Sequence, residues 1–217
     1  MIKFNLFWFF KFNYKFDILI GDILYSITMK FFIYFLTIIT MSSTTEKDTI
    51  IEMNTVYGTI CVKLFVKEAL TTYNNFLRFI DEHRYKDFHF YRTVTMSNQP
   101  MSNIKIEVIQ GGLGFEKHPL ELPPILHETT NATGIKHMNG TISMARIEPG
   151  SASSEIFICI NDQPELNYRG RRNIDAQGFA AFGKVIKDLN VLKEIHSLPP
   201  KDQFLNKELK VNFIKRI

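Results

Sequence analysis

Short runs of β-branched and aromatic residues, separated by glycine, proline and polar turn residues, recur along this chain from about residue 50 onwards. Runs of this length and composition are typical of β-strands. A chain with many short strands closes into a barrel or stacks as two sheets, because either arrangement buries the apolar faces. We expect strands at residues 50–53, 57–65, 88–94, 104–110, 141–145, 156–160, 178–186 and 208–214.

Two segments have helical character, residues 69–82 and 189–196. The first carries apolar residues at helical spacing on one face. The second ends before Pro199 and Pro200, which do not continue a helix. The sequence therefore predicts a mostly β fold, in which two helices could cap the open ends of a barrel.

The first 41 residues differ in composition from the rest of the chain. They contain nine of the 20 phenylalanines and the only tryptophan, Trp8. The apolar run at residues 31–41 is short for a membrane span but has the length of a signal-peptide core. Translation could begin at Met29, just before this run. We expect residues 1–41 to be an N-terminal leader, either a cleaved signal peptide or a retained membrane anchor.

Such a leader predicts an exported protein, periplasmic or secreted, that meets a membrane only through an uncleaved N-terminal segment. Residues 42–48 have the composition of a linker, and residues 49–217 suit one domain. The formal net charge is +4, of which the four lysines and two aspartates of the leader account for +2. The rest of the chain is close to neutral, so we expect no nucleic-acid partner.

Sequence motifs for a metal or a cofactor are missing. None of the six histidines stands in an H-x-x-H arrangement, and the two cysteines form no C-x-x-C pair. No P-loop, dinucleotide glycine motif or nucleophile elbow is present. We therefore expect neither a metal nor a cofactor. Cys61 and Cys159 lie in β-branched stretches and are expected to be buried free thiols, unless the fold brings their strands together as a disulfide.

Arg92 lies in a strand that otherwise has the composition of a core element. Strand alternation places Phe90, Arg92 and Val94 on the same face. An arginine in this position either points to solvent or lines a cleft, and its apolar neighbours favour the cleft. Gln110, at the end of the next expected strand, is followed by two glycines.

Six sequence blocks occur in a set order, at residues 57–60, 91–94, 108–112, 139–146, 153–158 and 182–185. Taken together, they resemble the cyclophilin-type peptidyl-prolyl cis-trans isomerases from about residue 49 to the C-terminus. Stretches at residues 98–100 and 150–155 are most similar to a bacterial branch of the family. The resemblance implies a closed eight-stranded antiparallel β-barrel capped by two α-helices, with a proline-binding groove on its outer face.

The resemblance also implies which residues form the site. The family's catalytic arginine, a hydrogen-bond donor to the nitrogen of a twisted X-Pro amide, falls on Arg92. The glutamine that binds the peptide backbone falls on Gln110. The proline pocket would be apolar, with Phe157 as its floor and Val108, Ala145, Leu166 and Phe179 around it.

Several positions depart from the family's pattern and make the groove more charged. Arg146 replaces an asparagine and Glu155 a glutamine; these two side chains could pair with each other or bind a charged flank of the substrate. Glu165 replaces a tryptophan. Glu107 replaces a pocket phenylalanine, although a methionine from the inserted stretch at residues 96–105 could restore the apolar surface.

The function implied by the resemblance is isomerisation of X-Pro bonds in proline-containing peptides and unfolded, exported client proteins. A monomer without a cofactor is implied as well. The altered groove leaves open a second interpretation, a cyclophilin-fold binding module or chaperone with little turnover. An unrelated barrel enzyme is the third. Arg92 favours the isomerase, because a pure binding module has no need of a donor aimed at a twisted amide.

Overall fold

The computed structural model describes residues 27, 29–30 and 48–217. Most of the expected leader and linker, residues 1–41 and 42–48, therefore lies outside the described residues, and those that are described at residues 27 and 29–30 are helical. Among the described helices, none has both the length and the apolar composition that crossing a membrane requires. From Asp48 to Ile217 the chain forms one compact unit.

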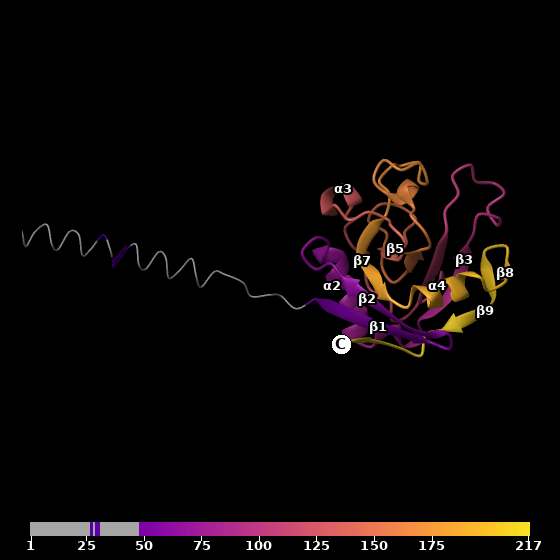
Figure 1. Ribbon diagram of the computed structural model, residues 1–217, viewed down its shortest axis with the longest axis horizontal. Helices are drawn as coiled ribbons and strands as arrows, with labels where there is room; N and C mark the ends of the chain where they lie inside the picture. Colours follow the sequence, from indigo (N-terminus) through magenta and orange to yellow (C-terminus); the bar gives the residue numbers. More distant parts are fainter. Residues whose placement is uncertain (1–26, 28, 31–47) are drawn as a thin grey trace, which may run out of the picture. The chain divides into compact units, whose positions relative to one another are not determined.

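In the described part of the chain, ten strands form a single sheet in which every pairing is antiparallel (Figure 1). Their order is β10-β1-β2-β7-β5-β6-β4-β3-β9-β8. The strands are β1 Thr49–Thr55, β2 Gly58–Leu64, β3 His89–Val94, β4 Val108–Gly112, β5 Thr141–Met144, β6 Ile156–Cys159, β7 Ala180–Lys187, β8 Pro200–Lys201, β9 Phe204–Lys210 and β10 Phe213–Arg216.

The prediction of a mostly β, antiparallel fold is confirmed, but the closed eight-stranded barrel is wrong in two respects. The described residues form ten strands, and their hydrogen-bonded order is open, with β10 and β8 at its ends. The difference arises near the C-terminus, where the strand expected at residues 208–214 is interrupted. The N–H groups of Val211 and Asn212 donate to the carbonyls of Phe88 (3.0 Å) and Asn54 (2.8 Å).

This interruption divides the C-terminal segment between two distant strands of the order. The residues before it form β9, which pairs with β3, and the residues after it form β10, which pairs with β1. Because only two residues separate β9 from β10 while almost the whole order lies between them, the sheet has to curl around an enclosed interior.

The two faces of the central strands bury different apolar clusters. Ile109 of β4 and Ile158 of β6 belong to the large cluster that fills the interior. Their chain neighbours Val108 and Phe157 belong to a second, smaller cluster. Successive side chains of a strand point to opposite faces, so this second cluster lies on the outer face of the sheet. Burial on both faces explains why β6 is continuously apolar.

Two helices occur where the sequence predicts them, α2 at Leu70–Asp81 and α4 at Leu189–His196. In α2, the buried ring of Phe76 packs against Phe182 of β7, with centroids 5.1 Å apart. In α4, Leu192 and Ile195 are buried. The shorter helical segments are α3 Thr130–Thr133 and the 3-10 turns η1 Arg84–Asp87 and η2 Pro164–Leu166.

The N-terminus of α2 is capped by a carboxylate from a distant loop. Its N-cap residue, Ala69, supplies no side-chain acceptor. Instead, the Glu128 carboxylate accepts hydrogen bonds from the N–H groups of Thr71 (3.1 Å) and Thr72 (2.8 Å). A negative group here satisfies the free N–H groups of the first turn and interacts favourably with the helix dipole.

Both cysteines are free and buried, so the prediction of buried free thiols is confirmed. Burial, with a smaller contribution from Asp162, raises the pKa of the Cys159 thiol well above its ordinary value. The thiol therefore stays protonated and packs as a small apolar side chain in the outer cluster.

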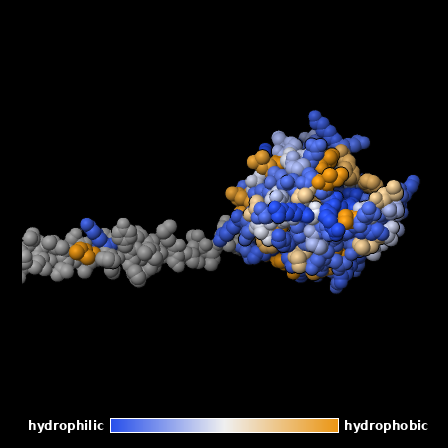
Figure 2. Space-filling model, turned by 90° about the horizontal axis from the view of Figure 1, so that it is seen from above, coloured by the Kyte–Doolittle hydropathy of each residue, from blue (hydrophilic) through white to orange (hydrophobic). Residues whose placement is uncertain are grey.

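The visible surface of this unit is mixed in polarity. Large apolar side chains such as Val56, Ile147 and Ile174 are exposed, but they come from separate segments of the chain. In the view of Figure 2, hydrophilic residues predominate and the apolar patches between them are small. On this face, apolar area alone does not mark a binding site.

Candidate active site

The centre of the site is a row of side chains across three neighbouring strands, β3, β4 and β6. Arg92 of β3 lies opposite Gln110 of β4, and Gln110 lies opposite Phe157 of β6. Residues that face each other across an antiparallel pair have Cβ atoms roughly 5 Å apart, so the three side chains can act on one ligand. The sequence predicted all three as site residues, and the sheet register brings them together.

A β-bulge in β3 decides which way Arg92 points. Phe90 pairs with Gly111 and Arg92 pairs with Gln110, which leaves Tyr91 as an extra residue. Phe90 packs in the interior, whereas Arg92 lines the cleft on the outer face. The expectation that regular alternation puts Phe90 and Arg92 on the same face is therefore wrong. Bulges re-aim side chains in this way, and they are frequent beside active sites.

The cleft has a volume of about 540 Å³, within the range of small-molecule and peptide side-chain sites. Its apolar base is formed by Val108, Phe157 and Leu166, which are at most 4% exposed. The ring of Phe179 stands edge-on to Phe157 with centroids 5.2 Å apart. All nine residues that the sequence assigned to the site line this one cleft: Arg92, Val108, Gln110, Ala145, Arg146, Glu155, Phe157, Leu166 and Phe179.

The guanidinium of Arg92 is held from two sides. Nη1 donates to Oε1 of Gln110 (2.7 Å), while Nε (3.1 Å) and Nη2 both donate to Oε1 of Gln203. Three of its five N–H groups are used in this way, which leaves two for a ligand. Burial lowers the pKa of Arg92, and Arg172 lowers it further while Tyr91 opposes this. A guanidinium is so basic that it remains charged nevertheless.

Gln203 is a site residue that the sequence did not indicate. It lies in the turn between β8 and β9, and its carbonyl accepts a hydrogen bond from the N–H of Thr93 (2.9 Å). An isolated glutamine in a polar stretch carries no signal of its own. Only the pairing of β9 with β3, which spans more than a hundred residues of sequence, places it beside Arg92.

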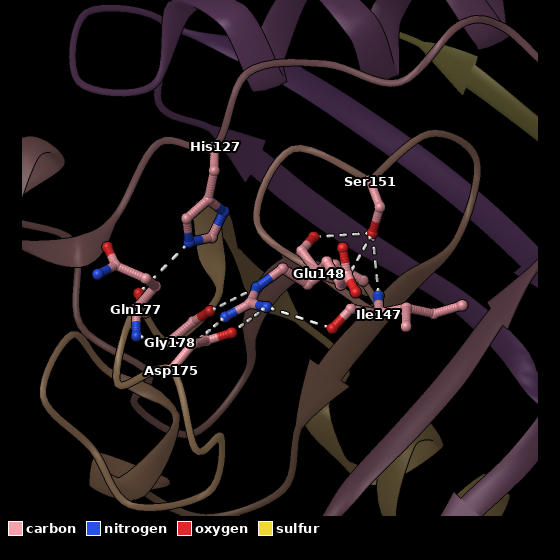
Figure 3. Close-up of polar contacts among 8 residues, drawn as sticks. His127, Ile147, Glu148, Ser151, Asp175, Gln177 and Gly178 are labelled. Carbon is pink, nitrogen blue, oxygen red and sulfur yellow. Dashed lines mark hydrogen bonds and ion pairs between the residues drawn. The ribbon is translucent and has the colours of Figure 1, made fainter.

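Arg146 and Glu155 do not form the pair that the sequence left open. The guanidinium of Arg146 donates to both carboxylate oxygens of Asp175 (2.8 and 2.9 Å) and to the carbonyl of Gly178 (2.8 Å) (Figure 3). It also lies over the Phe179 ring, 5.2 Å from its centroid. Arg146 lowers the pKa of Asp175 by this contact. The Arg146 side chain is 1% exposed and therefore supports the cleft wall rather than projecting from it.

Two of the expected charged changes lie outside the cleft lining. Glu107 accepts a hydrogen bond from Asn161 (3.0 Å). Glu165 pairs with Arg171 (2.6 Å), whose hydrogen bonds lower the pKa of Glu165 to about 2. Neither carboxylate is among the cleft residues. The groove of this protein is therefore less altered than the sequence comparison at these positions implied.

No residue of the inserted stretch lines the cleft, but Ile106, which directly follows it, does. Met96 and Met101 are exposed and do not line the cleft, so the expectation that one of them restores the apolar surface is wrong. Ile106 is 7% exposed and lines the cleft. It precedes Val108 and Gln110 at intervals of two, so strand alternation extended by one step would have found it.

The loop that carries Ile106 is fixed by a buried glutamine. Gln99, only 2% exposed, donates to the carbonyls of Thr95 (2.7 Å) and Ile106 (2.8 Å). Its Oε1 accepts from the N–H of Ile106 (3.3 Å). Arg172 also holds this loop, since it donates to the carbonyl of Ile104 (2.6 Å). The insertion therefore holds Ile106 at the cleft and is itself bonded to its surroundings.

A buried histidine, which the sequence did not indicate either, supports the floor of the cleft. The His137 ring stacks on Phe157, with centroids 5.8 Å apart and an interplanar angle of 16°. Nδ1 bonds to Oδ1 of Asn167 (2.9 Å) and Nε2 to the hydroxyl of Ser143 (3.0 Å). Burial lowers the pKa of His137 to about 4, so the ring is neutral at pH 7.

A family model and two relatives of known sequence point to the same protein family. The family model described as "Cyclophilin type peptidyl-prolyl cis-trans isomerase/CLD" matches residues 50–215. A peptidyl-prolyl cis-trans isomerase of Acinetobacter baylyi is 33% identical over 156 residues, which cover 70% of this chain and 74% of the relative. The peptidyl-prolyl cis-trans isomerase cyp18 of Streptomyces antibioticus is 32% identical over 149 residues, which cover 67% and 81% of the two chains.

The fold has a counterpart among solved structures. A cyclophilin-type peptidyl-prolyl cis-trans isomerase of Cryptosporidium parvum is 23% identical and superposes with a TM-score of 0.61. The superposition covers 79% of this chain and 98% of the other. At this level of identity the likeness shows the fold alone.

Proposed function

This chain belongs to the cyclophilin-type peptidyl-prolyl cis-trans isomerase family and is an isomerase, and we propose that Arg92 is the residue that acts on the X-Pro bond. One observation carries the proposal. A guanidinium with two N–H groups to spare is fixed between Gln110 and Gln203, at the edge of an apolar pocket floored by Phe157.

The reaction explains why a fixed donor beside an apolar floor is sufficient. Rotation about an amide destroys its resonance and meets a barrier of about 18–20 kcal/mol. No covalent bond has to form, so catalysis requires only that the twisted amide bind more tightly than either planar form. In the twisted state the proline nitrogen becomes pyramidal and accepts a hydrogen bond. Arg92 offers that bond from a position already fixed, in surroundings where burial strengthens it.

The remaining cleft residues have separate roles in this proposal. Phe157, Leu166 and Val108 form the apolar surface on which the pyrrolidine ring packs. Gln110 binds the peptide backbone through the amide N–H that its contact with Tyr91 leaves free. Ala145 and Phe179 bound the groove on the side of β5 and β7.

A single experiment tests the role of Arg92. Exchange between cis and trans forms of a peptide with one X-Pro bond is measured by NMR, with the full chain and with Arg92→Ala. We expect the substitution to lower kcat/KM by a factor of ten or more, since one preorganised donor is lost. Arg78→Ala is the matched control: this arginine is exposed on α2, pairs with Glu82 (2.6 Å), and should leave activity unchanged.

The second interpretation, a binding module with little turnover, makes a different prediction. In that case neither the full chain nor Arg92→Ala speeds exchange, yet both bind the peptide. Its motivation was the loss of groove residues to glutamates. Since the carboxylates of Glu107 and Glu165 do not line the cleft, the argument for it now rests on Glu155 alone.

The clients that we propose are unfolded exported proteins that expose X-Pro bonds, and the isomerase would act on them as a monomer. This part of the proposal is supported by the composition of residues 1–41. It predicts a mature protein that lacks the leader or remains attached to a membrane by it. The N-terminal sequence and fractionation of the protein from its own cells would test this. A full-length chain in the cytoplasmic fraction would contradict it.

A further inference from the structure

Glu155 lies in the wall of the cleft, but its carboxylate is bound by the protein itself. Four donors reach it, three at Oε1 and one at Oε2. A Cβ atom at Gly112 would overlap the carboxyl group, so glycine at this position leaves room for it. The donors are the N–H groups of Leu113 (2.8 Å) and Gly114 (3.0 Å) and the hydroxyls of Ser154 (3.0 Å) and Tyr91 (2.5 Å).

The contact with Tyr91 begins a chain of hydrogen bonds whose direction is fixed. A carboxylate only accepts, so the Tyr91 hydroxyl donates to Glu155 and turns its lone pairs toward Gln110. The Nε2 group of Gln110 donates to this oxygen (2.9 Å). Oε1 of the same amide then faces Arg92 and accepts from its Nη1 (2.7 Å). Each bond in the chain thus determines the orientation of the next group.

The direction matters because a glutamine amide has two nearly isosteric orientations. If the amide of Gln110 were reversed, its NH₂ group would face the guanidinium of Arg92, and two donors would oppose each other. The Tyr91 hydroxyl excludes this orientation only while it is itself committed to Glu155. Burial, with a further contribution from Glu155, raises the pKa of Tyr91 far above its ordinary value, so the hydroxyl keeps its proton.

We propose that Glu155 is a positioning residue, which acts through Tyr91 and Gln110 to hold the Arg92 guanidinium in the orientation that catalysis requires. Glu155 then has no direct contact with the peptide, in contrast to the expectation from sequence. The catalytic consequence rests on the proposed function, whereas the orientation of the amide and the guanidinium is a property of the free protein. Turnover and side-chain orientation are therefore measured separately.

Turnover is measured on the full chain with Tyr91→Phe, which removes the hydroxyl but keeps the ring that packs edge-on to Phe115 (4.9 Å). We expect kcat to fall about tenfold, the equivalent of one hydrogen bond to a charged group, with KM within about twofold of the original. Tyr73→Phe is the matched control. It removes a hydroxyl bonded to Thr49 (2.8 Å), and Tyr73 lies on α2, away from the cleft lining.

The order of these hydrogen bonds, from Glu155 through Tyr91 and Gln110 to Arg92, predicts how substitutions combine. Tyr91 acts through Gln110, so Tyr91→Phe should cause no further loss of kcat in a Gln110→Ala background. Glu155→Gln keeps an acceptor oxygen for Tyr91 but adds a competing donor, so it should retain more activity than Glu155→Ala. A residue that only stabilised the 111–114 segment would not give the first result, because Tyr91→Phe would then act independently of Gln110.

Orientation is measured without substrate, from the ¹⁵N-detected NMR signals of the Arg92 Nε–H group and the Gln110 side-chain amide. We expect both signals to shift or broaden in Tyr91→Phe and in Glu155→Gln, and neither to change in Tyr73→Phe. If the full chain did not speed X-Pro exchange at all, the proposed function would fail, and these signals alone would decide whether the chain of bonds exists.

Two results would overturn the proposal. One is a Tyr91→Phe protein with unchanged kcat and unchanged Arg92 and Gln110 signals. The other is a Glu155→Gln protein with unchanged kcat but an altered KM for peptides that differ in the charge beside proline, because that result would make Glu155 a direct substrate contact.

Discussion

The histidine beneath the cleft floor predicts how stability depends on pH. His137 is 1% exposed, and both of its ring nitrogens are engaged. Since Asn167 offers Oδ1 to Nδ1, that nitrogen carries the proton, and Nε2 accepts from the Ser143 hydroxyl. Protonation would add an N–H at Nε2, which the Ser143 hydroxyl could accept only by reversing. It would also bury a charge that has no acidic partner among the described residues. Burial accordingly lowers the pKa of His137 from 6.5 to about 4.

A lowered histidine pKa removes stability as the pH falls. Above pH 6.5 the ring is neutral in both the folded and the unfolded state, so it makes no pH-dependent contribution. Between pH 6.5 and pH 4 only the unfolded state takes up the proton, and the free energy of unfolding decreases. From pH 7.5 to pH 5.5, this single group should lower the free energy of unfolding by roughly 1 to 2 kcal/mol.

Urea unfolding at pH 7.5 and pH 5.5, monitored by circular dichroism, measures this change. In His137→Gln the difference in unfolding free energy between the two pH values should shrink by roughly 1 to 2 kcal/mol. The matched control is His83→Asn, at an exposed position with φ of 53°, a left-handed conformation that asparagine tolerates. It should leave the pH dependence unchanged.

A direct observation covers the case in which His137→Gln does not fold. The Cε1–H NMR signal of His137 in the original protein should not titrate between pH 7.5 and pH 5.5. Titration with a midpoint near 6.5, or an undiminished pH dependence in a folded His137→Gln protein, would refute the reasoning from burial.

Two further substitutions test the inserted stretch and the residue that follows it. Ile106→Ala should raise KM by roughly threefold to tenfold with little change in kcat, because it removes apolar contact that the planar and twisted amides share. Glu107→Ala, at a position outside the cleft lining, is the control. A fall in kcat alone would contradict the assignment of Ile106 to the cleft surface. Gln99→Ala should lower the free energy of unfolding by about 2 kcal/mol in urea titrations, since it removes the donor to the buried carbonyl of Ile106 and one of the two donors to the carbonyl of Thr95. Ser97→Ala, at an exposed position, should not.

Much of the fold could be read from local patterns. β6 is buried on both faces and appears as a continuous apolar run, and α2 has a clear apolar stripe. The C-terminal strands were harder, because β9 alternates buried Leu205 and Leu209 with exposed, mostly charged or polar residues. One continuous strand and two consecutive short strands with different partners have the same local pattern. The sequence therefore could not show that the segment divides into β9 and β10.

The composition of the candidate cleft could be anticipated to the extent that its residues match the family's pattern. Arg92, Gln110 and Phe157 were identified in this way, and the register aligns them. Gln203 and His137 were not, because each acts through a contact between distant segments and neither stands in a recognisable motif. Glu155 was assigned to the correct cleft, but only the structure shows which donors its carboxylate accepts from.

The bulge at Tyr91 connects these observations. In a regular strand, Tyr91 and Arg92 would point to opposite faces of the sheet. With the extra residue, both reach the same side chain of β4: the amide of Gln110 donates to Tyr91 at one end and accepts from Arg92 at the other. A one-residue irregularity thus converts two consecutive side chains into a clamp on one amide. The feature that made strand alternation fail as a predictor is therefore the feature that sets the geometry of the site.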